Sequence, residues 1–184
     1  MIQKTYSGIG SRQTPPRILD LMTKIASFME KQGYILQSGG APGADNAFES
    51  GVANPEMKMI YLPWLKFNGN TSPLYKVSKA AITLASYFHP SWYKLTEAAK
   101  LLMARNGYQV LGKDLNTPVE MIICYTPHGK IEGGTGQAMR IAKHFNIPIF
   151  NLYYKKDTDQ VLSWIELDKI SYIKDVELQS WKLI

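Results

Sequence analysis

Three glycine-rich segments each follow an apolar, strand-like run and precede a helix-like run. They are Gly8-Ile9-Gly10-Ser11-Arg12, Ser38-Gly39-Gly40-Ala41-Pro42-Gly43-Ala44-Asp45 and Ile131-Glu132-Gly133-Gly134-Thr135-Gly136-Gln137. Glycine at such a turn lets the backbone approach a phosphate, and the following helix N-terminus supplies partial positive charge. Strands that alternate with helices require right-handed crossovers. The pattern therefore predicts an α/β fold, with a doubly wound parallel sheet in a single domain.

Hydrophobic periodicity places the elements around these turns. Short apolar runs predict strands over 5–9, 34–37, 57–62, 119–125 and 147–152, and helical spacing predicts helices over 18–29, 44–52, 77–88, 95–103 and 138–145. Thr14 is the expected N-cap of the first helix and Gly33 its end. After Arg105, Gly107 and Gly112 predict a shaped loop above the sheet. Residues 63–73 form a second long loop directly after a strand.

All three glycine-rich turns lie on the carboxyl side of predicted strands, so we expect them to meet in one crevice. The expected ligand is a nucleotide, held by main-chain N–H groups and nearby side chains. The predicted binding residues are Gly8, Gly10, Ser11, Arg12, Ser38, Gly39, Gly40, Gly43, Asp45, Trp64, Arg105, Gly133, Gly134, Thr135, Gly136, Gln137 and Arg140.

Several of these residues have an alternative role. The first turn lacks the third glycine of the dinucleotide fingerprint, because Gln13 stands there, so it could also be a tight turn without a ligand. Asp45 could accept a hydrogen bond from a ribose hydroxyl or cap the following helix. Trp64, in the 63–73 loop, could stack on a base or simply anchor its loop.

Charge and cysteine content restrict the class of protein further. The 184 residues hold 21 Lys plus Arg and 15 Asp plus Glu, and residues 1–156 alone carry a net charge of +9. An anion site is therefore expected upstream of residue 157. The single cysteine, Cys124, excludes an intrachain disulfide and fits a reducing cytoplasm. No His, Asp or Glu spacing indicates a metal site, and no signal peptide or membrane span is expected.

The runs YSGIGSR, ILQSGGAPGADNAFESG and IEGGTGQAMRIAKHFNIPIFNL resemble the Rossmann-like SLOG superfamily, which includes DprA/Smf recombination mediators and lonely-guy (LOG) phosphoribohydrolases. The resemblance covers about residues 5–152 and leaves 153–184 as a C-terminal extension of the same domain. SGGAPGAD is most similar to the DprA branch, and HPSWYKL, ARNGYQVLG and YLPW are similar to small stand-alone bacterial and phage members. The resemblance implies a nucleotide-binding crevice and a homodimer or higher homo-oligomer.

The LOG-like enzymes provide an informative contrast. Their motif pairs an Arg with P-G-G-x-G-T-x-x-E, and the Arg and Glu promote cleavage of a base from ribose 5′-phosphate. Here Arg105 matches the Arg, but Glu132 replaces the Pro and Gln137 the Thr. Arg140 stands where the catalytic Glu is expected. An Arg cannot serve as a general base at neutral pH, so the resemblance implies the phosphate cradle rather than hydrolysis.

Three functions follow as expectations. The first is binding of a nucleotide or nucleotide-derived signalling metabolite without turnover and without a required cofactor, for sensing or sequestration. The second is a LOG-like N-glycosidic hydrolase in which Arg105 and a displaced Glu132 are catalytic. The third is a DprA-like single-stranded DNA binder, for which the chain lacks a dense Lys/Arg stripe and would bind weakly. The alternating tail at 169–184 could be an edge strand or a dimerisation arm.

Overall fold

The sheet is built outward from its first strand in both directions. The computed structural model describes residues 3–166, and the strands in this part of the chain are β1 (Thr5–Gly10), β2 (Ile35–Ser38), β3 (Lys58–Ile60), β4 (Met121–Tyr125) and β5 (Ile149–Asn151). All are parallel, in the order β3-β2-β1-β4-β5. The order reverses between β1 and β4. In sheets of this type, ligands bind at that switch point.

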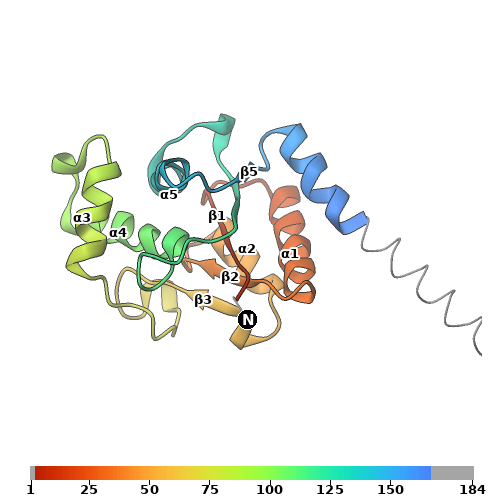
Figure 1. The fold of residues 1–184 in the computed structure, drawn as a ribbon, viewed down its shortest axis with the longest axis horizontal. Helices are drawn as coiled ribbons and strands as arrows, with labels where there is room; N and C mark the ends of the chain where they lie inside the picture. The colour runs from red at the N-terminus through yellow and green to blue at the C-terminus, as the bar shows by residue number, and fades with distance from the viewer. Residues whose placement is uncertain (1–2, 167–184) are drawn as a thin grey trace, which may run out of the picture.

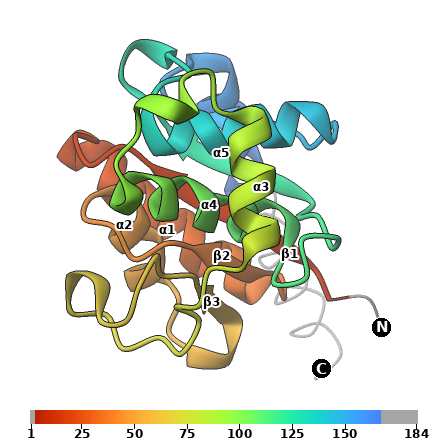
Figure 2. The same cartoon turned by 90° about the vertical axis from the view of Figure 1, so that its left-hand side faces the viewer.

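Helices cover both faces of the sheet. They are α1 (Pro16–Lys31), α2 (Ala44–Gly51), α3 (Lys79–Phe88), α4 (Glu97–Leu111) and α5 (Gly133–His144). Figure 1 shows α1 and α2 on one side of the strands, and α4 and α5 on the other. Figure 2 shows α3 lying outside α4. The sheet with a helical layer on each face confirms the predicted α/β class.

Side chains of β1 alternate between the two helical layers. Tyr6 packs in the cluster that contains Met22 and Phe48 from α1 and α2, whereas Ile9 packs with residues of α4 and α5. β1 pairs with β4 from Tyr6 opposite Met121 to Gly10 opposite Tyr125. The long shared register fixes the carboxyl ends of these two strands beside each other.

The predicted cap of α1 is wrong. Pro15 is the N-cap and makes no side-chain capping bond, whereas the Thr14 hydroxyl donates to the Ser11 carbonyl at 2.7 Å. Thr14 therefore closes the turn after β1 rather than the first turn of the helix. The expected end is confirmed, because α1 stops at Lys31 and Gly33 follows with a φ of 79°.

α4 continues where the sequence predicted a loop. Gly107 lies inside the helix, and a Cβ at that position would be 3.0 Å from Leu84 Cδ2. The glycine therefore allows α3 to pack closely on α4, and this contact outweighs the low helix propensity of glycine. The helix ends at Leu111, with Gly112 as its C-cap at a φ of 74°.

Residues 155–166 form a further helix that packs on the α1 side of the sheet. Val161 is 1% exposed, and the Trp164 ring lies edge-on to the Phe150 ring with centroids 5.0 Å apart. This part of the C-terminal extension thus adds to the core. The predicted strand or arm at 169–184 lies outside the described residues. Within 3–166, no helix combines the length and apolar character needed to cross a bilayer.

Candidate nucleotide-binding site

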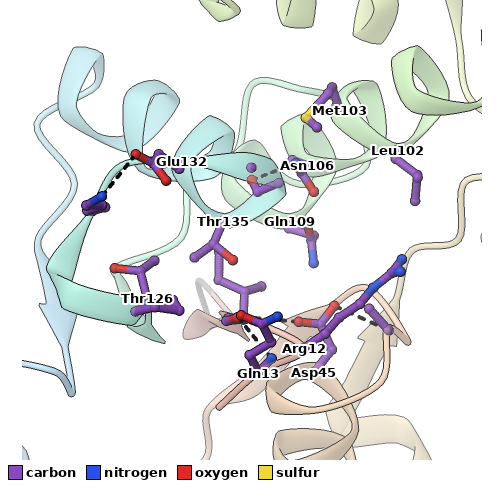
Figure 3. A pocket seen from close by; sticks show the side chains of 18 of the residues that line it. Arg12, Gln13, Asp45, Leu102, Met103, Asn106, Gln109, Thr126, Glu132 and Thr135 are labelled. Carbon is purple, nitrogen blue, oxygen red and sulfur yellow. Dashed lines mark hydrogen bonds and ion pairs between the residues drawn. The ribbon is translucent and has the colours of Figure 1, made fainter. Parts of the chain in front are cut away.

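A cavity of about 560 Å³ opens at the switch point between β1 and β4. All three glycine-rich segments contribute to its lining, together with α4 and the turn after β4. Figure 3 shows Arg12, Gln13 and Asp45 on one side of the cavity and Asn106 and Gln109 of α4 on the other. The volume is within the range of about 300–1,000 Å³ that is typical of small-molecule sites.

The turn after β1 uses most of its N–H groups within the protein. The Gly10 N–H donates to Asp45 Oδ1 at 3.3 Å, and the Ser11 N–H donates to the Tyr125 carbonyl at 3.0 Å. The Gln13 N–H donates to the hydroxyl oxygen of Ser11 at 3.0 Å. These groups are therefore not free for a phosphate.

The loop after β2 is similarly satisfied. Ala41 N–H donates to Asp45 Oδ2 at 3.4 Å, and Ala44 N–H donates to the Ser11 carbonyl at 3.4 Å. Gly43, with a φ of 86°, allows this approach, because a Cβ there would lie 2.9 Å from Arg12 Cα. The first two glycine loops thus pack against each other, and the Asp45 carboxylate occupies the anion position between them.

Asp45 also pairs with Arg105 in the floor of the cavity. Asp45 Oδ2 is 3.4 Å from Arg105 Nη1, and the side chains are 4% and 7% exposed. Burial raises the pKa of Asp45 because it penalises the charged form, and Arg105 and the two N–H donors offset this only in part. Burial likewise lowers the pKa of Arg105, against the effect of Asp45. The pairing therefore stabilises the charged form of each partner inside the protein.

Two amide side chains of α4 extend this network towards the third loop. When the Gln109 amide is assigned in the orientation that satisfies its neighbours, its oxygen accepts from Gly39 N–H at 3.0 Å and from Arg105 Nη1 at 2.9 Å, and its NH2 donates to Asn106 Oδ1 at 2.6 Å. The Arg105 guanidinium lies so close to Gly39 that a Cβ there would overlap it. Asn106 Nδ2 in turn donates to the Gly134 carbonyl at 2.9 Å. A continuous polar chain therefore runs from Asp45 to α5.

The third loop differs, because its first N–H groups have no protein acceptor among the described residues. Gly136 N–H donates to the Glu132 carbonyl at 2.9 Å and is the first intrahelical donor of α5. Gly133, Gly134 and Thr135 precede it and line the cavity. The N-cap residue, Glu132, forms no side-chain capping bond. The positive end of the helix dipole thus faces the cavity with three unused donors.

The exposed charges around the cavity are mostly cationic. Arg12 is exposed and forms no ion pair within residues 3–166. Lys130 Nζ is 3.9 Å from Glu132 Oε1, but these side chains are 61% and 74% exposed, so water screens their interaction. Arg12 is therefore the cation best placed to meet an anion in the cavity.

The structure brings about half of the predicted binding residues into the cavity lining. Those that line it are Gly10, Ser11, Arg12, Asp45, Arg105, Gly133, Gly134 and Thr135. Glu132, the catalytic candidate of the hydrolase alternative, lines it as well. Those that do not are Gly8, Ser38, Gly39, Gly40, Gly43, Trp64, Gly136, Gln137 and Arg140.

Most residues outside the lining have packing or bonding roles. Gly8 faces Phe48, whose ring would clash with a Cβ, and the Ser38 hydroxyl donates to the Gly8 carbonyl at 2.7 Å. Gly136 lies against the Ile131 backbone. The Trp64 ring stands edge-on to Phe67, with centroids 5.1 Å apart. This contact is the loop-anchoring alternative that the sequence left open.

Gln137 and Arg140 turn away from the expected phosphate. Gln137 is fully buried and its amide donates to the Ala85 carbonyl at 2.9 Å. Arg140 Nε donates to the Phe88 carbonyl at 2.9 Å, Nη1 to the Ile131 carbonyl at 3.2 Å, and Nη2 to Gln137 Oε1 at 2.9 Å. Both side chains thus join α5 to α3 and to the loop before α5.

Sequence reasoning missed other residues of the lining, among them the polar residues Asn106, Gln109, Thr126 and His128. Arg105, Asn106 and Gln109 occupy neighbouring positions on one helix face. The sequence would have indicated this if the predicted helix had continued past residue 103. The structure also contains, among the described residues, no cluster of three His, Cys, Asp or Glu side chains suited to a metal ion.

Comparison with known proteins identifies a solved structure that has a similar fold. No protein-family model matches the chain, and no curated protein sequence matches it significantly. A solved structure of DNA processing protein A from Helicobacter pylori, described for its single-stranded DNA binding mode, is similar with a TM-score of 0.55. The two are 18% identical, over 94% of this chain and 81% of that one. At this identity the likeness is one of fold, and it supports a Rossmann-like parallel sheet.

Proposed function

We propose that the cavity binds a nucleotide through its phosphate, and that the nucleotide is released unchanged. The observation that carries the proposal is the open N-terminus of α5, where Gly133, Gly134 and Thr135 direct unused N–H donors at a cavity that Arg12 also lines. A phosphate placed there gains hydrogen bonds, the helix dipole and an unpaired cation together. Retention without turnover fits sensing or sequestration.

The charged side chains of the cavity favour binding over hydrolysis. Asp45 and Glu132 are the carboxylates of the lining. Both Asp45 oxygens already accept hydrogen bonds from the protein, and Glu132 is largely exposed beside Lys130. Arg105 is held in the pair with Asp45. A general acid or base needs a free carboxyl close to the reacting atoms. Asp45 is already engaged by the protein, and Glu132 lies in an exposed position beside Lys130, which supports binding over hydrolysis.

Single-stranded DNA is a second candidate, which the structural neighbour favours because that protein is described as binding it. The same phosphate site could hold one phosphate of a strand, so the two candidates share their chemistry. The net charge of +9 over residues 1–156 is compatible with either. They differ in the number of phosphates held, and hence in salt dependence.

The test is calorimetric titration of nucleoside 5′-monophosphates and of short oligonucleotides into wild type, Gly134→Asp and Gly134→Ala. A Cβ at Gly134 would meet only Asn106 Nδ2, at 3.6 Å, so both variants should fold. We expect Gly134→Ala to bind like wild type and Gly134→Asp to lose affinity by about tenfold or more, because its carboxylate repels the phosphate. A folded Gly134→Asp that binds normally would contradict the site.

Two further readouts separate the alternatives. Bound nucleotide recovered by chromatography should be intact, whereas free base that disappears in Glu132→Gln would establish a hydrolase. Each phosphate neutralised adds about −0.7 to the log–log salt slope for a single strand. A slope steeper than about −4, with tight binding at physiological salt, would establish DNA as the ligand.

A further inference from the structure

An aromatic surface continues from the cavity onto the turn after β5. His128 lines the cavity, and its ring stands edge-on to the Tyr153 ring, with centroids 6.2 Å apart. The Tyr153 ring also lies 5.3 Å from the Tyr154 ring and 6.3 Å from the Tyr125 ring. Tyr153 and Tyr154 are 43% and 44% exposed. Tyr153 is therefore a half-exposed aromatic side chain in contact with the cavity lining through His128.

Buried hydrogen bonds hold this surface in place relative to the cavity. Asn151 Nδ2 donates to Thr126 Oγ1 at 2.7 Å, and Asn151 Oδ1 accepts from the N–H groups of Thr126 and Tyr153, each at 3.2 Å. Asn151 and Thr126 are each 2% exposed. The Asn151 N–H donates to Asp157 Oδ2 at 2.9 Å, which fixes the next helix as well. The backbone that carries Tyr153 is thus tied to the segment that lines the cavity.

Other exposed aromatic side chains lack this placement. Tyr87 and Tyr93 are 77% and 79% exposed, and no ring contact joins either of them to a residue of the cavity lining. Trp64, the aromatic that the sequence singled out, packs on Phe67, which is not a residue of the lining. Tyr153 combines exposure, ring contact with a cavity residue and a fixed backbone.

On the basis of the proposed function, we infer that Tyr153, together with His128, forms the base-stacking subsite for the nucleotide whose phosphate lies at α5. A side chain whose backbone is fixed before binding loses less conformational freedom when a base stacks on it. Stacking accepts any base, because every base presents a π-face. The subsite therefore selects nucleotides over sugar phosphates, and it discriminates little between bases.

The test compares adenosine 5′-monophosphate with ribose 5-phosphate, using calorimetry on wild type, Tyr153→Ala, Tyr153→Phe and Tyr93→Ala. We expect Tyr153→Ala to weaken adenosine 5′-monophosphate binding by about tenfold, within the range measured for base stacking on aromatic side chains. The same variant should bind ribose 5-phosphate as wild type does. Tyr153→Phe keeps the ring and should stay within about twofold of wild type, and Tyr93→Ala controls for loss of an exposed tyrosine elsewhere.

Each other outcome has a definite meaning. Equal nucleotide affinity in wild type and Tyr153→Ala would overturn the stacking subsite and leave the phosphate site standing. An equal loss for both ligands would assign Tyr153 a purely structural role and overturn the subsite too. If wild type binds neither ligand, the phosphate site itself is wrong, and the stacking subsite fails with it.

Discussion

The first two glycine loops and the third have similar sequences but opposite hydrogen-bond states. In the loops after β1 and β2, N–H groups donate to Asp45, Ser11 and Tyr125. At the start of α5, the N–H groups of Gly133, Gly134 and Thr135 have no acceptor among the described residues and face the cavity. A glycine-rich turn can thus bind an external anion only where its N–H groups do not already donate to an acceptor of the protein.

The carboxylate of Asp45 acts as that internal acceptor. It lies between the first two loops and draws Arg105 from α4 into the floor of the cavity. The third loop is held from outside instead, by the Asn106 bond to the Gly134 carbonyl, and this leaves its N–H side open. We therefore expect damage to the first region to reduce stability, and damage to the second to reduce binding.

We expect the largest change in the free energy of unfolding, at the loops after β1 and β2, whose N–H groups already have acceptors in the protein. Arg105→Leu should lower the free energy of unfolding by about 3–5 kcal/mol, because it leaves Asp45 buried without its charge partner. Urea denaturation at neutral pH measures this. The control is Arg17→Leu, which removes an exposed arginine of α1. A loss below about 1 kcal/mol for Arg105→Leu would mean that the pair does not hold the loops together.

The second prediction concerns the hydrogen bond from Asn106 to the Gly134 carbonyl, which holds the first turn of α5. Asn106→Ala removes the donor to the Gly134 carbonyl and the acceptor for Gln109, so it should cost about 1–3 kcal/mol of stability. Nucleotide affinity should fall by about three- to tenfold, because the first turn of α5 is no longer held. Calorimetry beside urea denaturation separates the two changes. Asn116→Ala, at an exposed position, serves as control, and unchanged affinity in folded Asn106→Ala would refute the supporting role.

We expect the smallest effect for Arg12, the exposed arginine of the cavity lining. Arg12→Gln should leave stability within about 0.5 kcal/mol of wild type, since the side chain is exposed and unpaired. It should reduce nucleotide affinity severalfold and, if a single strand binds, flatten the log–log salt slope by about 0.7. Titrations at several salt concentrations measure both. The same result in Arg17→Gln would show that general charge, rather than the position of Arg12, is responsible.

The sequence predicted the framework of the fold well because its signals are local. Apolar runs of strand length, glycine turns and helical stripes all describe short segments, and the parallel sheet follows from their alternation. The end of α1 before Gly33 is of this kind. Gly107 was misread because the local propensity of glycine gives no information about Leu84 on α3, which packs into the space that its missing Cβ leaves.

The candidate site was predicted less completely, because side-chain direction and hydrogen-bond partners depend on tertiary contacts. A motif comparison placed Arg140 at a catalytic position but could not show that carbonyls of Ile131 and Phe88 accept its hydrogen bonds. Likewise, the sequence could not show that Asp45 fills the space between two loops. Which N–H groups remain free is a property of the assembled fold.

In the proposed site, the phosphate binds at the open start of α5 and not at the loops after β1 and β2. Amide resonances of ¹⁵N-labelled protein, followed during titration with adenosine 5′-monophosphate, test it directly. We predict that the largest chemical shift changes occur at Gly133, Gly134 and Thr135, with small changes at Gly10, Gly39 and Ala41. If the largest changes occur at Gly10, Gly39 and Ala41 while Gly134 is unaffected, the phosphate does not bind at α5.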